Sequence, residues 1–194
     1  SEGQSLVLPA IKILETDGKK KPHIEGMAAF NKKAMAGFLD PQTSHCLNIT
    51  RNKLKGGVFT LDLEDDGMHD VSLEIQKTKS KLKYKFENDQ VHITVEPSMF
   101  VFINELNVDI DLLNPKNVSE LQTNMEEKMS EEIENALEQV QRVIGSDVIG
   151  VGKTIYQKQP KLWKELKDNW DEYFKNMTIE VKAKINIINS SLSK

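Results

Sequence analysis

The sequence predicts an α+β fold: a mainly antiparallel sheet with a long helix and shorter C-terminal helices packed on one face, closing with a C-terminal strand. Two observations predict this class. Short segments that alternate apolar and polar residues fill residues 6–103, whereas apolar residues recur every three or four positions across residues 115–174. A last alternating segment follows at residues 178–187. Strands, then helices, then a strand are typical of helices packed against one sheet.

The sequence shows no sign of a boundary between domains. The 194 residues contain no internal repeat of useful length and no low-complexity linker, so residues 1–194 are predicted to form one α+β domain. Within it, residues 1–40 are predicted to be a β-rich N-terminal segment. Residues 41–194 are predicted to be the main body of sheet and helices.

Short strands are predicted in the N-terminal segment. These strands are residues 6–8, 11–14, 24–30 and 33–39. Pro9 is predicted to separate the first two, because proline lacks the N–H group that a sheet ladder uses. Asp17-Gly18 is a strong turn signal and closes the second strand.

A short helix and a second group of strands are predicted next. Asp40 is the predicted N-cap and Pro41 the first helical residue of a helix that reaches residue 52. The strands that follow are residues 58–63, 71–75, 77–86, 91–95 and 99–103. Asn88-Asp89 is the predicted hairpin turn between the third and fourth of these strands.

A long helix is predicted to open at Asn114-Pro115, because apolar residues recur there as one continuous stripe. The stripe comprises Val118, Leu121, Met125, Met129, Ile133, Leu137, Val140 and Ile144. The glutamates predicted to lie mostly toward solvent are Glu126, Glu127, Glu131, Glu132 and Glu134.

Shorter elements are predicted after Gly145. Asp147 is the predicted cap of a short helix that ends before Pro160, and one amphipathic helix follows over residues 162–174. Its aromatic residues recur at helical spacing, which predicts packing rather than a binding stripe; they are Trp163, Trp170, Tyr173 and Phe174. Residues 178–187 alternate apolar and polar residues and predict a closing strand.

The composition excludes several classes of protein. Thirty acidic residues outnumber 26 basic ones, giving a net charge of −4, whereas nucleic-acid-binding proteins usually carry a basic surplus. We therefore predict no nucleic-acid partner. Cys46 is the only cysteine, which excludes an intramolecular disulfide and a multi-cysteine zinc site. The longest apolar runs are far shorter than the ~20 residues that a membrane-spanning helix needs.

No arrangement of residues in the sequence indicates catalysis. Gly152-Lys153-Thr154 resembles the end of a phosphate-binding loop, but Asp147 stands where that motif requires its first glycine and would repel a phosphate. Cys46 lies beside His45, but neighbours on a helix point about 100° apart and pair poorly as nucleophile and base. We therefore predict no catalytic residues, no cofactor and no metal ligands.

Alternating lysines mark one possible interaction surface. They are Lys77, Lys79, Lys81, Lys83 and Lys85, all on one face of a predicted strand. Such a face could contact an anionic lipid, a nucleic acid or an acidic partner. The negative overall charge favours the simpler interpretation, which is a solvated strand face or a guarded sheet edge, where lysines discourage edge-to-edge pairing.

Several blocks of the sequence resemble one family. Residues 145–152 read Gly-Ser-Asp-Val-Ile-Gly-Val-Gly, and Gln-Pro-Lys-Leu-Trp-Lys and Trp-Asp-Glu-Tyr-Phe follow at residues 159–164 and 170–174. The earlier blocks are residues 26–39, 55–58, 71–75 and 79–83. In this order and spacing, from Ile24 to the end, the chain resembles spore germinant receptor C subunits, the Ger(x)C-type spore germination lipoproteins of Bacillus and Clostridium relatives.

The resemblance implies a non-catalytic subunit that acts in nutrient-triggered spore germination through contacts with the membrane-embedded A and B subunits of a germinant receptor. It also implies a lipid anchor on the outer face of the spore inner membrane. Cys46 has no apolar signal before it, so the anchor is expected to precede Ser1. The isolated domain is expected to be a monomer. Two alternatives stay open: a small-molecule (nutrient) sensing module, and a module that binds anionic lipid surfaces.

Overall fold

The computed structural model describes residues 2–31, 34–108 and 110–188, and it confirms the predicted α+β class. Its strands are β1 (Val7–Thr16), β2 (Lys19–Phe30), β3 (Met35–Leu39), β4 (Gly57–Asp62), β5 (Asp70–Glu87), β6 (Gln90–Leu106), β7 (Thr178–Val181) and β8 (Lys184–Ile187). Its helices are α1 (Pro41–Thr50), α2 (Pro115–Ile144), α3 (Val151–Lys158), α4 (Pro160–Leu166) and α5 (Trp170–Asn176).

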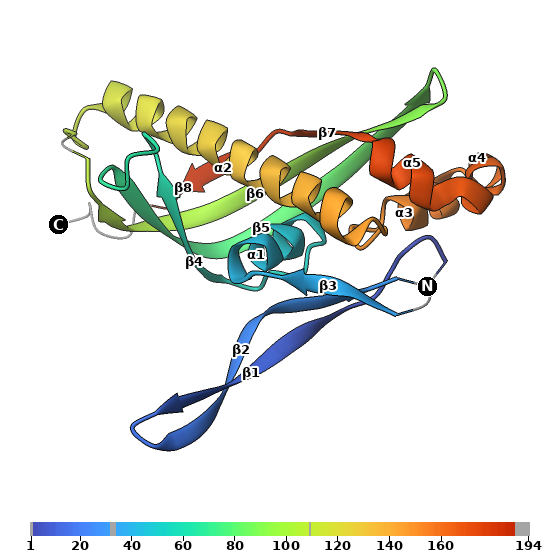
Figure 1. Cartoon of the computed structure of the whole chain (residues 1–194). Coiled ribbons are helices and arrows are strands. Elements are labelled where there is room, and N and C mark those ends of the chain that lie inside the picture. The colour runs from blue at the N-terminus through green and yellow to red at the C-terminus, as the bar shows by residue number, and fades with distance from the viewer. Residues whose placement is uncertain (1, 32–33, 109, 189–194) are drawn as a thin grey trace.

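The strands form two sheets. One is three-stranded in the order β1-β2-β3, and the other is five-stranded in the order β4-β5-β6-β7, with β8 also paired to β6. Helix α2 runs across the larger sheet, and α3, α4 and α5 gather near one of its ends (Figure 1). The β1–β2 hairpin extends away from the rest of the chain as a two-stranded ribbon (Figure 1). The division of the chain at residue 40 stays a prediction.

The N-terminal sheet corrects one predicted boundary. Residues 6–8 and 11–14 were expected as two strands, but β1 runs through Pro9 and absorbs it in a register shift between Pro9 and Ile11. Proline is tolerated there because β1 is an edge strand, where a missing N–H breaks no ladder. The predicted turn is confirmed: Asp17 and Gly18 both have positive φ, of 54° and 68°, as a tight hairpin turn requires.

The predicted N-cap Asp40 and the predicted helix start at Asn114-Pro115 are both confirmed. Asp40 Oδ1 accepts a hydrogen bond from the N–H of Thr43 at 2.9 Å, and Pro41 is the first residue of α1. Asn114 Oδ1 accepts from the N–H of Lys116 at 3.0 Å, directly before Pro115 in α2. Proline fits here because its missing N–H would have no partner inside the helix in any case.

The main sheet joins segments that were expected as separate strands. Residues 71–75 and 77–86 form the single strand β5, with a bulge between Ile75 and Lys77. Gln76 is the extra residue, and it reverses which residues face the core. Before the bulge the odd-numbered residues are buried, as Ile75 is; after it the even-numbered ones turn inward, as Ser80 does. The bulge therefore places the odd-numbered lysines of β5 on the solvent face.

Strand β6 likewise runs unbroken through Pro97, where two strands were expected. The predicted closing strand, residues 178–187, is instead split into β7 and β8, and both pair with β6 in parallel. Val95 O and Val101 O accept from the N–H groups of Lys182 and Ile188. Pro97 has the same parity as these two residues, so its nitrogen faces the gap between β7 and β8. No ladder bond is lost there.

The long helix buries its predicted stripe, with Val118 half-buried. The prediction for its glutamates is only partly correct. Glu127 and Glu131 are exposed, but Glu126, Glu132 and Glu134 are half-buried and bonded to other elements. Among the residues that the structure describes, none of the helices combines the length and apolar composition that crossing a bilayer requires.

The C-terminal helices differ from the prediction in their boundaries. Helix α3 begins after Gly150 rather than at Asp147, and a 3₁₀ turn (Lys167–Asn169) breaks the expected single helix into α4 and α5. The aromatic residues pack as predicted: Trp163 and Trp170 are buried edge to face, with ring centroids 5.2 Å apart. Gly152 makes this possible, because a Cβ there would lie 2.8 Å from both rings.

Candidate functional site

The face of the main sheet opposite α2 carries the predicted lysines and is called here the basic face. Strand β5 contributes Lys77, Lys79, Lys81, Lys83 and Lys85, and all five are exposed. The register sets each lysine beside one residue of β6, and the rows continue onto β7 and β8. Lys79, for example, lies beside Ser98, which pairs with Lys184. Five lysines on β5 and two lysines on the segment spanning β7 and β8, Lys182 and Lys184, therefore flank the central strand.

Part of the basic face is hollowed into a groove of about 560 Å³, called here the lysine groove. It is lined by Lys77, Lys79, Lys81, Glu96, Pro97, Ser98, Phe100, Lys182 and Lys184. The lysines stand on its two sides, on β5 and on the segment spanning β7 and β8. Two interstrand steps separate these sides by about 10 Å. Phe100 leaves 43% of its surface exposed.

The lysines differ in their pairing. Lys83 Nζ contacts Glu96 Oε1 at 2.5 Å, Lys182 Nζ contacts a carboxylate oxygen of Glu180 at 2.8 Å, and Lys184 Nζ contacts Glu126 at 2.8 Å. No ion pair within the described chain involves the three β5 lysines of the groove, which are Lys77, Lys79 and Lys81. The groove therefore holds an excess of positive charge.

The structure thus separates the five predicted residues into three groups. Lys77, Lys79 and Lys81 line the groove, Lys83 is tied to Glu96, and Lys85 lies beyond the groove on the same face. Sequence reasoning missed Lys182 and Lys184. Their spacing of two residues in an alternating strand was a visible signal. What the sequence did not show was that this strand pairs with β6 and brings them opposite β5.

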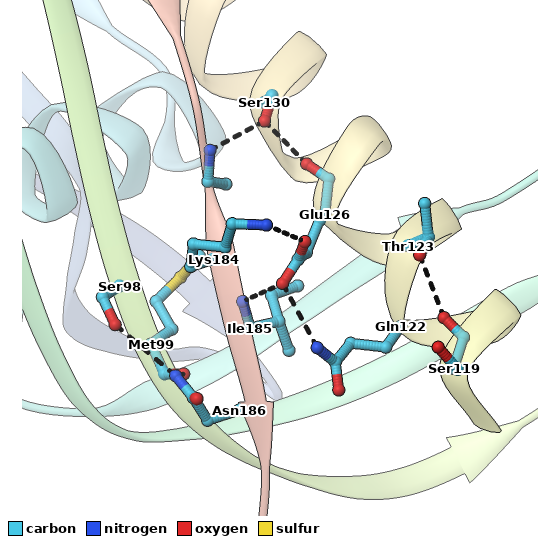
Figure 2. Close-up of polar contacts among 11 residues, drawn as sticks. Ser98, Met99, Ser119, Gln122, Thr123, Glu126, Ser130, Lys184, Ile185 and Asn186 are labelled. Atoms are coloured by element: carbon cyan, nitrogen blue, oxygen red, sulfur yellow. Dashed lines mark hydrogen bonds and ion pairs between the residues drawn. The ribbon is translucent and has the colours of Figure 1, made fainter. Parts of the chain in front are cut away.

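Helix α2 fixes the side of the groove that sequence reasoning missed. Three of its side chains, one turn apart, accept hydrogen bonds from backbone N–H groups on the free edge of β7 and β8. Glu134 accepts from Val181 at 3.1 Å, Ser130 from Ala183 at 2.9 Å, and Glu126 from Ile185 at 3.0 Å. Figure 2 shows Ser130 and Glu126 reaching from the helix toward this strand segment.

The spacing of these contacts follows from the geometry of the two elements. Four residues of helix advance about 6 Å, and two residues of strand advance about 6.6 Å. Side chains at every fourth helical position can therefore meet every second N–H group of a strand lying alongside. Such capping also blocks the edge against pairing with another chain. On the opposite side of β8, Asn186 Nδ2 donates to Met99 O at 3.1 Å (Figure 2).

In the apparent phosphate-loop motif, the backbone N–H groups already donate to a carboxylate of the chain itself. The carboxylate of Asp147 accepts from the N–H groups of Gly150, Val151 and Gly152 at 2.6, 3.2 and 2.7 Å, and from the indole N–H of Trp170 at 3.2 Å. Burial raises the pKa of Asp147 to about 6, while these hydrogen bonds act to lower it. The backbone donors that a phosphate would use are therefore satisfied internally.

Cys46 is not in a position to act as a nucleophile. Its side chain is fully buried, and Sγ donates to the carbonyl oxygen of Glu132 at 3.8 Å. Burial raises the pKa of this thiol to about 12, so it stays protonated at neutral pH. The ring of His45 instead stacks on Phe59, with centroids 6.2 Å apart.

One cluster in the described chain could hold a metal ion. Glu64, Asp66 and His69, in the loop between β4 and β5, place three ligand atoms within 4.8 Å of one another. His69 Nδ1 lies 2.6 Å from Asp66 Oδ2, and this hydrogen bond raises the pKa of the imidazole. All three groups lie at the surface, where such an ion pair forms without a metal.

Comparison with known proteins gives consistent results. The model of the family described as "Spore germination B3/ GerAC like, C-terminal" matches residues 25–191. Spore germination protein KC of Bacillus subtilis (strain 168) is 28% identical over 179 residues, covering 91% of this chain and 44% of that protein. Spore germination protein B3 of the same organism is 24% identical over 189 residues, covering 96% and 49%.

A solved structure shares the fold. The crystal structure of the GerBC protein aligns with a TM-score of 0.81 at 21% identity, over 96% of this chain and 57% of that chain. The chain thus spans about half the length of the proteins that it matches. The resemblance read from the ordered sequence blocks is confirmed.

Proposed function

Since the chain belongs to the family of spore germination B3/GerAC-like C-terminal domains, we propose that it is a non-catalytic domain of a spore germinant receptor subunit of the C type. It contributes to nutrient-triggered germination through contacts with the membrane-embedded A and B subunits. The observation that carries this proposal is the family match over residues 25–191. The fold shared with the GerBC protein is in agreement with it.

Two groups with nucleophilic or anion-binding potential support a non-catalytic role. The Cys46 thiol is buried with a raised pKa, and the backbone donors around Gly152 are filled by Asp147. A nucleophile needs access to its substrate and an adjacent base, and Cys46 has neither. Turnover of peptide, ester or phosphate substrates by the purified chain would overturn this part of the proposal.

The basic face is the proposed contact surface, and the subunit is proposed to sit on the outer face of the spore inner membrane through a lipid anchor. Cys46 is not the anchor site, because its sulfur is buried in the core. In the absence of partners the chain is proposed to be a monomer. Analytical ultracentrifugation of the purified chain tests that point.

The direct test is binding to the soluble domain of the cognate A subunit, measured by calorimetry and by native mass spectrometry. Saturable one-to-one binding is the expected result. Absence of binding at high micromolar concentrations would overturn a contact between this chain and that domain. A chain heated past its unfolding transition and aggregated serves as the control for nonspecific association.

A second candidate function, nutrient binding, has one observation in its favour. A hollow of about 380 Å³ lies between the N-terminal residues 2–6 and the buried Trp163 and Trp170. Its size falls within the range of small-molecule sites. A panel of amino acids and sugars at millimolar concentration would then raise the melting temperature, because a ligand that binds only the native state stabilises it. A melting temperature unchanged across the panel would reject this candidate.

A further inference from the structure

We infer that the lysine groove binds an extended acidic segment of a partner protein, in which acidic side chains alternate with small residues. The inference rests on the proposed function, because it names the kind of segment that a receptor subunit would present to this chain. It is argued from the charge, the spacing and the shape of the groove.

The charge of the groove calls for an anionic partner. Five lysines line it against one carboxylate, Glu96, and that carboxylate already pairs with Lys83. The three β5 lysines have no ion-pair partner within the described chain. The whole chain carries a net charge of −4, so this positive region does not follow from composition. Charge of one sign gathered in a cleft attracts ligands of the opposite sign.

The spacing of the lysines favours an extended polypeptide. Lys77, Lys79 and Lys81 follow one another at every second strand position, about 6.6 Å apart. An extended segment repeats its own side chains on one face at the same interval, so alternate acidic residues can meet successive lysines. A helix with its side chains is about 10–12 Å across. The two sides of the groove are only about 10 Å apart, so an extended segment fits between them better than a helix does.

The shape of the groove favours a linear ligand over a flat surface. Its floor is the central strand β6, where the small residue Ser98 lies between the longer side chains of Glu96 and Phe100. A bilayer would touch the lysine tips and leave this hollow unfilled, whereas a single extended chain can lie in it. Phe100 contributes an exposed ring beside Lys77 and can accept one apolar side chain of the segment.

Two peptides of identical composition test the inference. One is an acetylated and amidated decapeptide that alternates glutamate and serine, and the other places five glutamates before five serines. Binding to the intact chain is measured by calorimetry at low ionic strength. The alternating peptide is expected to bind at least fivefold more tightly than the block peptide. Equal affinity would show attraction by charge alone and would overturn the inference.

Variants locate the binding. Lys79→Glu combined with Lys81→Glu is expected to weaken the alternating peptide at least tenfold. Lys158→Glu combined with Lys161→Glu, on exposed positions of α3 and α4, changes the net charge equally and is expected to leave affinity within twofold. Matching circular dichroism and melting temperature show that each variant is folded. An equal loss in both double variants would overturn the assignment to the groove.

Two further measurements separate this inference from its rivals. Sedimentation with vesicles of 70% phosphatidylcholine and 30% phosphatidylglycerol tests a lipid surface. Groove-dependent vesicle binding without peptide binding would overturn the inference in favour of lipid. If the A-subunit domain binds the wild type and the Lys79→Glu, Lys81→Glu variant equally, the proposed function survives and this inference fails. Peptide binding without A-subunit binding would instead contradict the proposed contact with that subunit.

Discussion

Glu126 of α2 accepts a hydrogen bond from the backbone N–H of Ile185 in β8, with 3.0 Å between Oε1 and the nitrogen. Its second carboxylate oxygen lies 2.8 Å from Nζ of Lys184. One side chain therefore holds both the backbone of the edge strand and a lysine of the groove (Figure 2). The helical pattern predicts that Glu126 faces solvent, but in the structure this residue positions the candidate interaction surface.

Removing this contact is expected to destabilise the fold. Glu126→Ala leaves the N–H of Ile185 without its acceptor, and an unsatisfied buried donor costs about 1–3 kcal/mol. Glu126→Gln keeps an acceptor oxygen and loses only the exposed ion pair to Lys184, which is worth about 0–1 kcal/mol. Urea unfolding of the two variants measures the difference. Equal destabilisation by alanine and glutamine would contradict the capping role.

The bulge at Gln76 is expected to be essential although its side chain is exposed. Deleting Gln76 removes the extra residue and turns one half of β5 over, which would direct lysines into the core. The deletion variant is expected to be insoluble or unfolded by circular dichroism. Gln76→Ala keeps the residue count and is expected to stay within ~0.5 kcal/mol of the wild type, as exposed substitutions usually do. A folded deletion variant would refute this account of the register.

Gly152 is expected to tolerate no side chain. An added Cβ would lie 2.8 Å from the rings of both Trp163 and Trp170, and overpacking of this kind typically costs about 1–3 kcal/mol. Gly152→Ala is therefore expected to lower the midpoint of urea unfolding and to change the near-ultraviolet circular dichroism of the two tryptophans. Lys153→Ala, one residue further on, is the matched control. A variant as stable as the wild type would show that α3 can move away from α4.

Asp147 is expected to make stability depend on pH with an unusual sign. Burial raises its pKa from the ordinary value of 3.8, which applies in the unfolded chain, to about 6 in the folded protein. Between these values the native state binds more protons than the unfolded state, so the free energy of unfolding contributed by this residue falls as pH rises from about 4 to about 6. The two pKa values correspond to a loss on the order of 3 kcal/mol.

Comparing the wild type with the Asp147→Asn variant separates the pH dependence contributed by Asp147 from that contributed by the other carboxylates. Urea unfolding of both proteins is measured at half-unit steps between pH 4 and pH 7. The wild type is expected to lose stability relative to the asparagine variant across this range and to level off above pH 6. A relative gain for the wild type would mean that the hydrogen bonds from Gly150, Val151 and Gly152 outweigh burial.

Local signals predicted much of the fold. The apolar stripe defined α2, the N-cap Asp40 and the Asn114-Pro115 pair placed two helix starts, and paired turn residues such as Asn88 and Asp89 placed the hairpins. These features depend on residues close in sequence. The misplaced boundaries arose where one residue is absorbed without ending a strand, as at Pro9 and Gln76. The presence of a proline or a glutamine does not by itself show whether a strand ends there or continues through a bulge.

The candidate site was harder to predict because it depends on pairing between distant residues. Lys79 and Lys81 were identified from alternation within one strand. Lys184 comes within reach of them only because β8 pairs with β6, and alternation cannot tell which strand lies beside which. The capping role of Glu126 was missed for a related reason. The helical pattern shows that it flanks the apolar stripe, but not that an edge strand lies alongside.

The parallel pairing of β7 and β8 with β6 also sets the order in which the chain can assemble during synthesis. Residues 92–101 of β6 leave the ribosome more than 80 residues before their partners at 178–187. In that interval one side of β6 has no neighbour, and an unpaired strand edge is where newly made chains associate wrongly. Contacts this far apart in sequence also slow folding. The nascent protein is therefore most exposed to misassembly just before its final strands emerge.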